Sequence, residues 1–287
     1  MYLNVNGHPT YCYTGGKAVD ATSIAAKPTI VFIHGVLNDH SVWILQTRYL
    51  AHHGYNVLAL DLPGHGRSAG VHHDVEPCRT VESAADFILA LLDAAGVQTA
   101  ALVGHSFGSL IALEVAARAP SRVSHLAMVG TAFPMPVSPA LLDASLNQPM
   151  KAIDMVNTFS HSMLAPPPST LGPGTWLYGG AKALMRRVQA SNTRFNLFHT
   201  GFTACNDYKK GLAGVKHASA AMLFIVGKSD QMTPPKAAQS LIIEAKAQGK
   251  NVNVVTLEAG HSLMTEAPDG VLMALKDFLA PLLITTA

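Results

Sequence analysis

Residues 99–119 read TAALVGHSFGSLIALEVAARA. The apolar run 99–103 is typical of a strand buried on both faces, and the run 110–119 has the spacing of a helix. Between them, Gly104-His105-Ser106-Phe107-Gly108 predicts a sharp turn with the serine at its tip. A serine on such a turn is held at a strained backbone angle, so the positions two residues to either side must lack a Cβ. We therefore expect the Ser106 hydroxyl to project from the carboxyl end of a strand.

The same turn predicts an anion-binding group. The N–H of Phe107 would open a helix, where the helix dipole favours negative charge. One pentapeptide therefore supplies a candidate nucleophile and one donor to an oxyanion.

Strands and helices alternate along the rest of the chain. This alternation predicts an α/β fold with a mostly parallel central sheet and helices on both faces. Residues 3–5 and 9–13 read as an opening antiparallel hairpin. Thr80 is an expected helix N-cap and Gly96 an expected stop. The predicted buried strands are 29–33, 56–60, 99–103, 123–129, 221–226 and 252–257, and the predicted helices are 41–53, 80–95, 107–119, 235–248 and 269–283.

One interval interrupts this alternation. From Ala132 to about Lys216 there is no strand-like run, and helical stretches are separated by prolines and glycines, including Pro166–Pro168 and Gly172–Gly174. A structureless loop of this length is improbable in a compact domain. We therefore predict a helical cap over residues 132–216, inserted into a core formed by residues 1–131 and 217–287.

Composition limits the class of protein. The chain has 287 residues, 49% of them hydrophobic and 13% charged, with a formal net charge of +2. It has no basic block, so neither nucleic acid nor a membrane surface is an expected partner. Cys12, Cys78 and Cys205 lack the spacing of a disulfide framework or a zinc site. With no secretory signal at residues 1–11 and no apolar run of membrane-spanning length, we expect a soluble, cytoplasmic protein.

A serine nucleophile needs a base and a group that orients the base. Asp230 follows the strand predicted at 221–226, and His261 follows the strand predicted at 252–257. The carboxyl ends of parallel strands meet at one edge of the sheet, so Ser106, Asp230 and His261 are candidates for a catalytic triad. The alternatives are that Asp230 caps the helix near Pro235 and that His261 is a histidine at a helix start or on the surface.

The other histidines have weaker positions. Most of them follow no strand, and the adjacent pairs His52-His53 and His72-His73 point to opposite sides of an extended chain, so we predict no metal site. His105 is expected to pack against or orient the turn rather than act as the base.

A second oxyanion donor is expected after the strand 29–33. Gly35 lets the backbone turn tightly, which would bring the N–H of Val36 towards Ser106. His34 is expected to hold this loop by hydrogen bonding. The turn-rich segment Asp61–Ser68 is expected to brace the site without contributing a catalytic group.

Together these segments resemble the α/β-hydrolase superfamily, in particular its lidded serine hydrolase and esterase group. The resemblance runs through the core, from the His34-Gly35 loop and the turn at Gly104–Gly108 to the turns at Asp230 and His261. It implies a nucleophile elbow, a Ser-His-Asp triad, an oxyanion hole and a cap domain, with no cofactor. Haloalkane dehalogenases and epoxide hydrolases of this fold carry an aspartate at the elbow, so Ser106 favours acyl transfer.

We therefore expect cleavage of a small or medium carboxylic ester through an acyl-enzyme. A carbon-carbon bond (diketone-type) hydrolase, a thioesterase or a cofactor-free perhydrolase would use the same triad, and a non-catalytic ligand-binding protein is a further alternative. Trp43, Phe107, Phe133 and Trp176 are candidates for an apolar pocket, and Arg186-Arg187 is a candidate for holding a substrate carboxylate. The expected partner is a small acyl substrate, and no pattern predicts the natural substrate or the oligomeric state.

Overall fold

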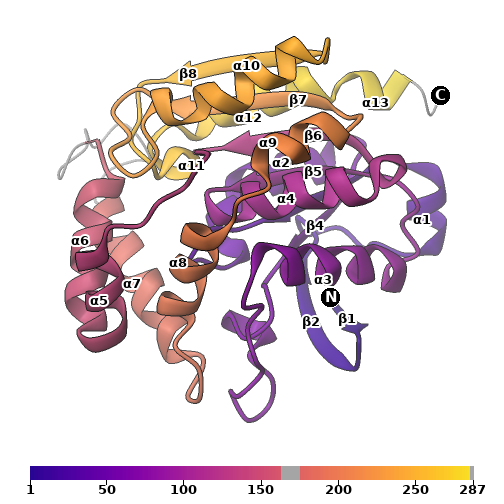
Figure 1. Ribbon diagram of the computed structural model, residues 1–287. Helices are drawn as coiled ribbons and strands as arrows, with labels where there is room; N and C mark the ends of the chain where they lie inside the picture. The colour runs from indigo at the N-terminus through magenta and orange to yellow at the C-terminus, as the bar shows by residue number, and fades with distance from the viewer. Residues whose placement is uncertain (163–174, 285–287) are drawn as a thin grey trace.

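The computed structural model describes residues 1–162 and 175–284, and its centre is an eight-stranded sheet (Figure 1). The strand order is β1-β2-β4-β3-β5-β6-β7-β8. Strand β2 runs antiparallel to both β1 and β4, and the remaining pairs are parallel, which confirms the predicted hairpin and parallel sheet. The strands are β1 (Tyr2–Val5), β2 (His8–Tyr13), β3 (Thr29–Ile33), β4 (Asn56–Leu60), β5 (Ala100–His105), β6 (Val123–Val129), β7 (Ala221–Gly227) and β8 (Val252–Leu257).

The inner strands are buried on both faces, as their continuous apolar runs predict. Every residue of β3, β4 and β5 is buried. The prediction was wrong for β8, which is the edge strand and leaves Val254 41% exposed. An apolar run does not distinguish an edge strand from a central one, because the number of neighbouring strands depends on other segments of the chain.

Two layers of helices cover the sheet (Figure 1). The first layer packs α3 (Val81–Ala94), α4 (Phe107–Arg118), α9 (Gly211–His217) and α10 (Gln239–Ala247) on one face, and the second packs α2 (Ile44–His52), α11 (Leu263–Glu266) and α12 (Pro268–Leu279) on the other. Thr80 caps α3 through a reciprocal pair of hydrogen bonds with Ser83, and Gly96 follows its end with a positive φ of 71°. The remaining short helices are α1 (Ala21–Ala26), η1 (His40–Trp43), η2 (Gly66–Ser68), η3 (Pro120–Arg122), η5 (Pro235–Ala238) and α13 (Pro281–Ile284).

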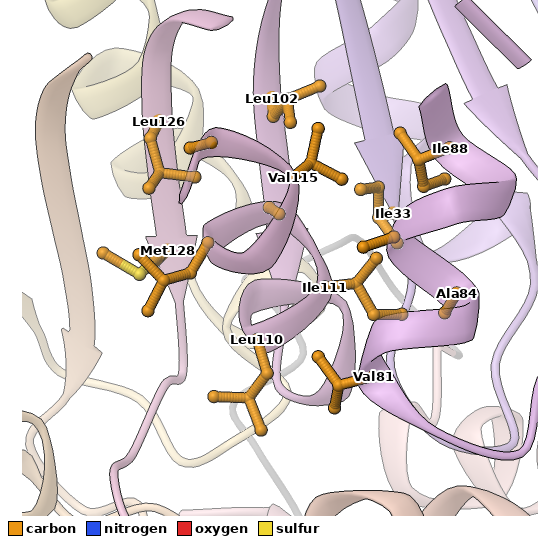
Figure 2. Close-up of a cluster of buried hydrophobic side chains, with 14 of the residues drawn as sticks. Ile33, Val81, Ala84, Ile88, Leu102, Leu110, Ile111, Val115, Leu126 and Met128 are labelled. Carbon is orange, nitrogen blue, oxygen red and sulfur yellow. The ribbon is translucent and has the colours of Figure 1, made fainter. Parts of the chain in front are cut away.

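Helix α4 is the most deeply buried helix of the first layer. Its residues 107–116 are all buried, and Figure 2 shows Ile111 and Val115 between β5 and α3. Alternate residues of β3 face the two layers, so that Ile33 contributes to the cluster around α4 whereas Phe32 contributes to the cluster around α2. This period of two is the reason why one strand can support both layers.

In the segment of the chain that connects β6 to β7, four helices lie to one side of the sheet (Figure 1). They are α5 (Pro139–Asn147), α6 (Pro149–Ser160), α7 (Leu177–Ala190) and α8 (Leu197–Asp207). No strand lies between β6 and β7 in the described residues, and these helices share a separate apolar cluster that also includes Leu37. The predicted breaks at Pro166–Pro168 and Gly172–Gly174 lie outside the described residues.

The predicted end of the cap at residue 216 does not match the packing. Helix α9 contacts α4 and α10, and Val215 belongs to the main core cluster. We therefore propose that the cap consists of α5 to α8 and ends before α9. None of the helices in the described part of the chain is long and apolar enough to cross a membrane.

The buried position of Ile111 leads to a stability prediction. Replacing Ile111, which is fully buried, with alanine should lower the free energy of unfolding by about 3 kcal/mol, because the surrounding side chains can fill the cavity only in part. Urea unfolding measures the change. The same replacement at Ile243, which is 63% exposed, should change it by less than about 0.5 kcal/mol. Equal losses at the two positions would contradict this description of the core.

Candidate active site

The candidate site lies where the sheet changes direction. From β3 the chain passes to β4 on one side and then to β5 on the other, so the loops after β3 and β5 separate at adjacent strand ends. Such a switch point leaves a crevice at the carboxyl edge of a parallel sheet. The loops after β7 and β8 reach the same edge and carry Asp230 and His261.

Ser106 occupies the predicted sharp turn between β5 and α4. Its backbone has φ 53° and ψ −118°, a conformation that residues other than glycine rarely adopt. A Cβ on Gly104 would lie 2.1 Å from the carbonyl oxygen of Gly108, and one on Gly108 would lie 2.3 Å from the carbonyl oxygen of Ile33. Both glycines are therefore needed for the turn to pack against β3.

Asp230 and His261 are in direct contact. The Nδ1–H of His261 donates to Oδ2 of Asp230 at 2.8 Å, and both residues are buried. Thr233 completes the arrangement, because its hydroxyl donates to the same carboxylate oxygen at 2.8 Å and its amide donates to Oδ1 at 2.7 Å. With Nδ1 facing the carboxylate, Nε2 is the nitrogen of His261 that is left for a reaction.

The carboxylate of Asp230 is held in its charged form. Burial alone would raise its pKa, but the charge and hydrogen bond of His261 and the two hydrogen bonds from Thr233 outweigh burial and lower the pKa to about 2. Asp230 therefore stays ionised at any pH near neutral and accepts a hydrogen bond from the Nδ1–H of His261.

The backbone of His261 is anchored on both sides. Its N–H donates to the carbonyl of Ser160 at 2.8 Å, at the end of cap helix α6. Its carbonyl accepts a hydrogen bond from Nε2–H of His105 at 2.9 Å. Burial and the neighbouring charge of His261 lower the pKa of His105 to about 3, so this ring is neutral. His105 thus orients the loop of His261, in line with the sequence prediction.

Ser106 and His261 line the same cavity. Its volume is about 270 Å³, and its remaining walls are mostly apolar. Ser106 and His261 therefore converge on one space that is large enough for a small organic molecule, and Asp230 contacts the histidine.

The loop after β3 supplies the second candidate oxyanion donor. His34 is fully buried; its Nδ1–H donates to the carbonyl of Gly35 at 2.8 Å, and its Nε2 accepts from the amide of Leu62 at 3.0 Å. Burial lowers the pKa of His34, which keeps this neutral form. Because C=O and N–H point in opposite directions across a trans peptide, holding the Gly35 carbonyl also sets the direction of the Val36 N–H. The Phe107 amide opens α4, where the first N–H groups have no partner inside the helix.

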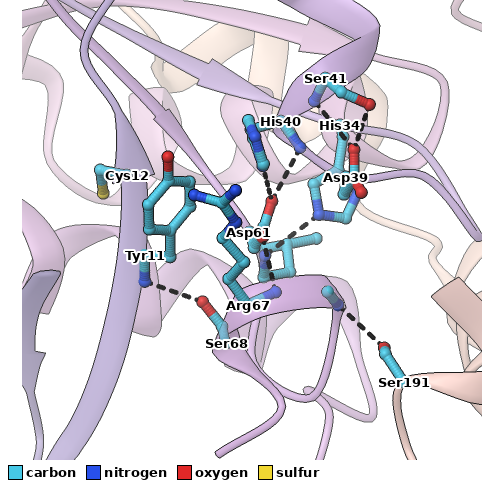
Figure 3. Close-up of polar contacts among 12 residues, drawn as sticks. Tyr11, Cys12, His34, Asp39, His40, Ser41, Asp61, Arg67, Ser68 and Ser191 are labelled. Atoms are coloured by element: carbon cyan, nitrogen blue, oxygen red, sulfur yellow. Dashed lines mark hydrogen bonds and ion pairs between the residues drawn. The ribbon is translucent and has the colours of Figure 1, made fainter. Parts of the chain in front are cut away.

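Asp61 joins this loop to the segment predicted to brace the site (Figure 3). Its carboxylate accepts from the amide and Nδ1–H of His40 at 2.8 and 2.7 Å, and from the amide of Arg67 at 2.9 Å. Asp39 lies close enough for the three side chains of Asp39, His40 and Asp61 to surround a metal ion. Each is already bonded to the protein, Asp39 to Ser41 and Arg187, so we assign this cluster to holding the loop.

The structure corrects most of the predicted pocket. Trp43 is fully buried in the core, with its ring 5.2 Å from that of Phe32, and Phe107, the first residue of α4, is buried in the main core cluster. Phe133 packs on Tyr208, with ring centroids 6.0 Å apart, and does not line the cavity. Trp176 lines a different cavity, of about 300 Å³, and is 62% exposed. Aromatic side chains were a poor guide because size favours burial in any core.

Methionines and cap residues line the cavity instead. Met155 and Phe159 lie one turn apart on α6 and therefore on one face, a spacing that could have indicated them in the sequence. Thr233 was also missed, although its place three residues after Asp230 suits a turn that hydrogen-bonds the carboxylate. The apolar lining consists mainly of Met135, Leu141, Met155, Phe159, Phe202 and Met232.

Comparison with known proteins agrees with this architecture. The model of the alpha/beta hydrolase family matches residues 30–274. The solved structure of an enol-lactonase from Burkholderia xenovorans has a TM-score of 0.77 at 22% identity, covering 98% of this chain and 100% of that one. An esterase from Exiguobacterium antarcticum has a TM-score of 0.78 at 17% identity, covering 98% and 99%. At these identities the two structures show a shared fold.

Curated relatives match over shorter segments. The dihydrolipoyllysine-residue acetyltransferase component of the acetoin cleaving system of Cupriavidus necator is 39% identical over 105 residues, which is 35% of this chain and 26% of that protein. The alignments cover between 26% and 44% of the length of the first relatives.

The low pKa of Asp230 predicts a dependence of stability on pH. Its pKa falls from 3.8 to about 2 on folding, so its ionised form stabilises the protein above pH 4, and this contribution is lost as the pH falls towards 2. The lost contribution is about 2 kcal/mol in total, of which about half is lost by pH 3. Urea unfolding at pH 6, 4 and 3 should show that the free energy of unfolding falls less with decreasing pH for Asp230→Asn than for the wild type. Parallel curves for the two proteins would refute the assignment.

Proposed function

The chain belongs to the alpha/beta hydrolase family, and we propose that it is a serine hydrolase that cleaves a small or medium carboxylic ester through an acyl-enzyme. The observation that carries the proposal is the buried contact between His261 and Asp230 at 2.8 Å beside a cavity that Ser106 also lines. A buried carboxylate that fixes the tautomer of a histidine is the arrangement that activates a serine.

In the first half of the reaction, Nε2 of His261 accepts the proton of Ser106 as Oγ attacks the carbonyl carbon of the ester. The positive charge that forms on the ring is balanced by Asp230, which stays ionised because its pKa is about 2. The amides of Val36 and Phe107 stabilise the oxyanion, and the position of Phe107 at the start of α4 adds the helix dipole.

In the second half, His261 gives its proton to the leaving alkoxide and the alcohol departs. The acyl group then remains on Ser106. Water enters, loses a proton to Nε2 and attacks the acyl carbon, and the collapse of the second oxyanion releases the acid and returns the proton to Ser106. This sequence requires only side chains and amides of the chain.

The cavity supports a substrate of limited size. Its volume of about 270 Å³ lies at the lower end of ligand pockets, and its walls are mainly apolar. Methionine side chains adapt to irregular shapes, so the lining favours apolar groups without demanding one outline.

The alternative reactions on the same residues are less well supported. A diketone-type hydrolase for ketoacids needs a cation that holds a substrate carboxylate, and Arg187, the sequence candidate, is paired with Asp39 at 3.0 Å. Its neighbour Arg186 is exposed on cap helix α7. A thioesterase or a perhydrolase would use the same apolar cavity, so substrates must distinguish these from an esterase.

Replacing the nucleophile tests the mechanism. Ser106→Ala should lower kcat for p-nitrophenyl butyrate by about 10,000-fold with an unchanged unfolding midpoint, because the hydroxyl is lost without a change in packing. A fluorophosphonate probe should label the wild type and not the variant. Ser219→Ala, at an exposed serine, should behave as the wild type. Turnover of Ser106→Ala within tenfold of the wild type would exclude the serine mechanism.

The cavity size predicts the chain-length preference. Among p-nitrophenyl esters of graded length, kcat/KM should be highest near butyrate or hexanoate and about tenfold lower for dodecanoate, which exceeds the space available. The same panel should include an acyl thioester and a vinylogous diketone. Cleavage of the diketone alone would replace the esterase proposal with a carbon-carbon hydrolase.

A further inference from the structure

Three cavities lie in series through the candidate site. The first is the apolar cavity of about 270 Å³, and the second, of about 60 Å³, shares Ser106, Phe202, Met232 and His261 with it. The third, of about 300 Å³, is lined by Trp176 and shares Asn38, His105, Ala181 and Ser262 with the second. Ser106 therefore stands at the junction between a large apolar space and a small inner one.

The inner cavity differs from the apolar cavity in size and in chemistry. Its volume of about 60 Å³ is less than a quarter of the volume of the apolar cavity, so it suits a much smaller group. Its lining is mixed: it includes the polar residues Asn38, Asn157, Ser160 and Ser262 and the apolar residues Val36, Val156, Met185 and Phe202. A short group that ends in a polar atom therefore suits this space better than a long alkyl chain.

Asn157 has an unmet hydrogen-bonding requirement. Its side chain is fully buried on cap helix α6, and its Nδ2–H donates to the carbonyl of Tyr178 at 2.9 Å. Its Oδ1 is buried as well, and no hydrogen-bond partner for it exists within the part of the chain that the structure describes. A buried acceptor without a donor is destabilising, and such atoms concentrate where a ligand completes the hydrogen bond.

We propose that the inner cavity is a binding site for a neutral hydrogen-bond donor on the substrate, with Asn157 Oδ1 as its acceptor. The substrate is then an ester with two unlike limbs. One limb is apolar and fills the cavity of about 270 Å³, and the other is short and ends in a hydroxyl or an N–H group. This inference rests on the proposed function and adds the substrate class to it.

The lining favours a neutral donor over an ammonium group. Among the described residues that line the inner cavity there is no carboxylate. A buried ammonium group without a counter-ion would lose its hydration at a large cost, whereas a hydroxyl needs only one acceptor. Asn157 therefore offers one free hydrogen-bond acceptor, and a neutral ligand with one donor meets it without adding a charge.

Two pairs of esters with equal numbers of non-hydrogen atoms test the inference. The first pair, 2-hydroxyethyl butanoate and propyl butanoate, places the hydroxyl on the alcohol side. The second pair, butyl 3-hydroxypropanoate and butyl butanoate, places it on the acyl side. In the wild type, the hydroxylated ester of at least one pair should have a kcat/KM about tenfold higher than its apolar partner, because the apolar ester leaves Asn157 Oδ1 unpaired. The pair that shows the preference identifies the limb.

Asn157→Leu removes the acceptor at nearly constant volume and should abolish the preference by slowing the hydroxylated ester and not its apolar partner. The matched control is Asn147→Leu, at an exposed asparagine on cap helix α5 that lines none of the three cavities. It should keep the wild-type ratios. If Asn157→Leu does not fold, Asn157→Ala, which removes the acceptor without adding a branched side chain, takes its place with the same expected result.

The outcomes separate the two proposals. Ratios within twofold of one for both pairs overturn the donor site and leave the esterase proposal intact, and they are the result expected if a retained water satisfies Asn157. A preference that survives in Asn157→Leu also overturns the role of Asn157. Absence of turnover of all four esters, together with no labelling of Ser106 by a fluorophosphonate, overturns the proposed function itself.

Discussion

The close approach of the first turn of α4 to the end of β3 is the contact on which the rest of the site depends. A Cβ on Gly108 would lie 2.3 Å from the carbonyl oxygen of Ile33, so only glycine allows the helix to begin there. This contact sets the strained backbone of Ser106 and brings the loop at Gly35 and Val36 beside it. The candidate nucleophile and both candidate oxyanion donors are thus positioned by backbone packing, which is less adjustable than side-chain packing.

Helices α6 and α7 of the proposed cap contact the loops of the candidate site. The end of α6 accepts the amide of His261 through Ser160, and Arg187 of α7 pairs with Asp39 beside the oxyanion loop. Asn157, whose Oδ1 has no donor in residues 1–162 and 175–284, lies on α6 one turn before Ser160. A ligand bound at Asn157 therefore contacts the same helix that anchors the candidate base, which links the recognition of a substrate to the position of His261.

The balance between burial and polar contacts sets the charge of the ionisable groups around Ser106. It lowers the pKa of His34, and with the neighbouring charge of His261 it lowers that of His105, so both rings act as neutral hydrogen-bonding groups. Asp230 is the opposite case, since its bonds to His261 and Thr233 outweigh burial and keep it ionised. The results differ because the bonds from His261 and Thr233 outweigh burial at Asp230, whereas burial outweighs the hydrogen bonds of the two histidines.

The sequence by itself determined the local features: the alternation of strands and helices, the hairpin, the cap of α3, and the residues that end each strand, among them Ser106, Asp230 and His261. These depend on periodicity and on steric limits that act over a few residues. Only the tertiary structure decided that β8 is an edge strand, that Trp43 and Phe133 lie away from the cavity, that α9 packs against α4 and α10, and that Asn157 Oδ1 finds no donor among the described residues. Each of these depends on which distant segment packs against a given face. Hydrophobic periodicity shows which face of a helix or strand is buried, but it does not show which element packs against that face.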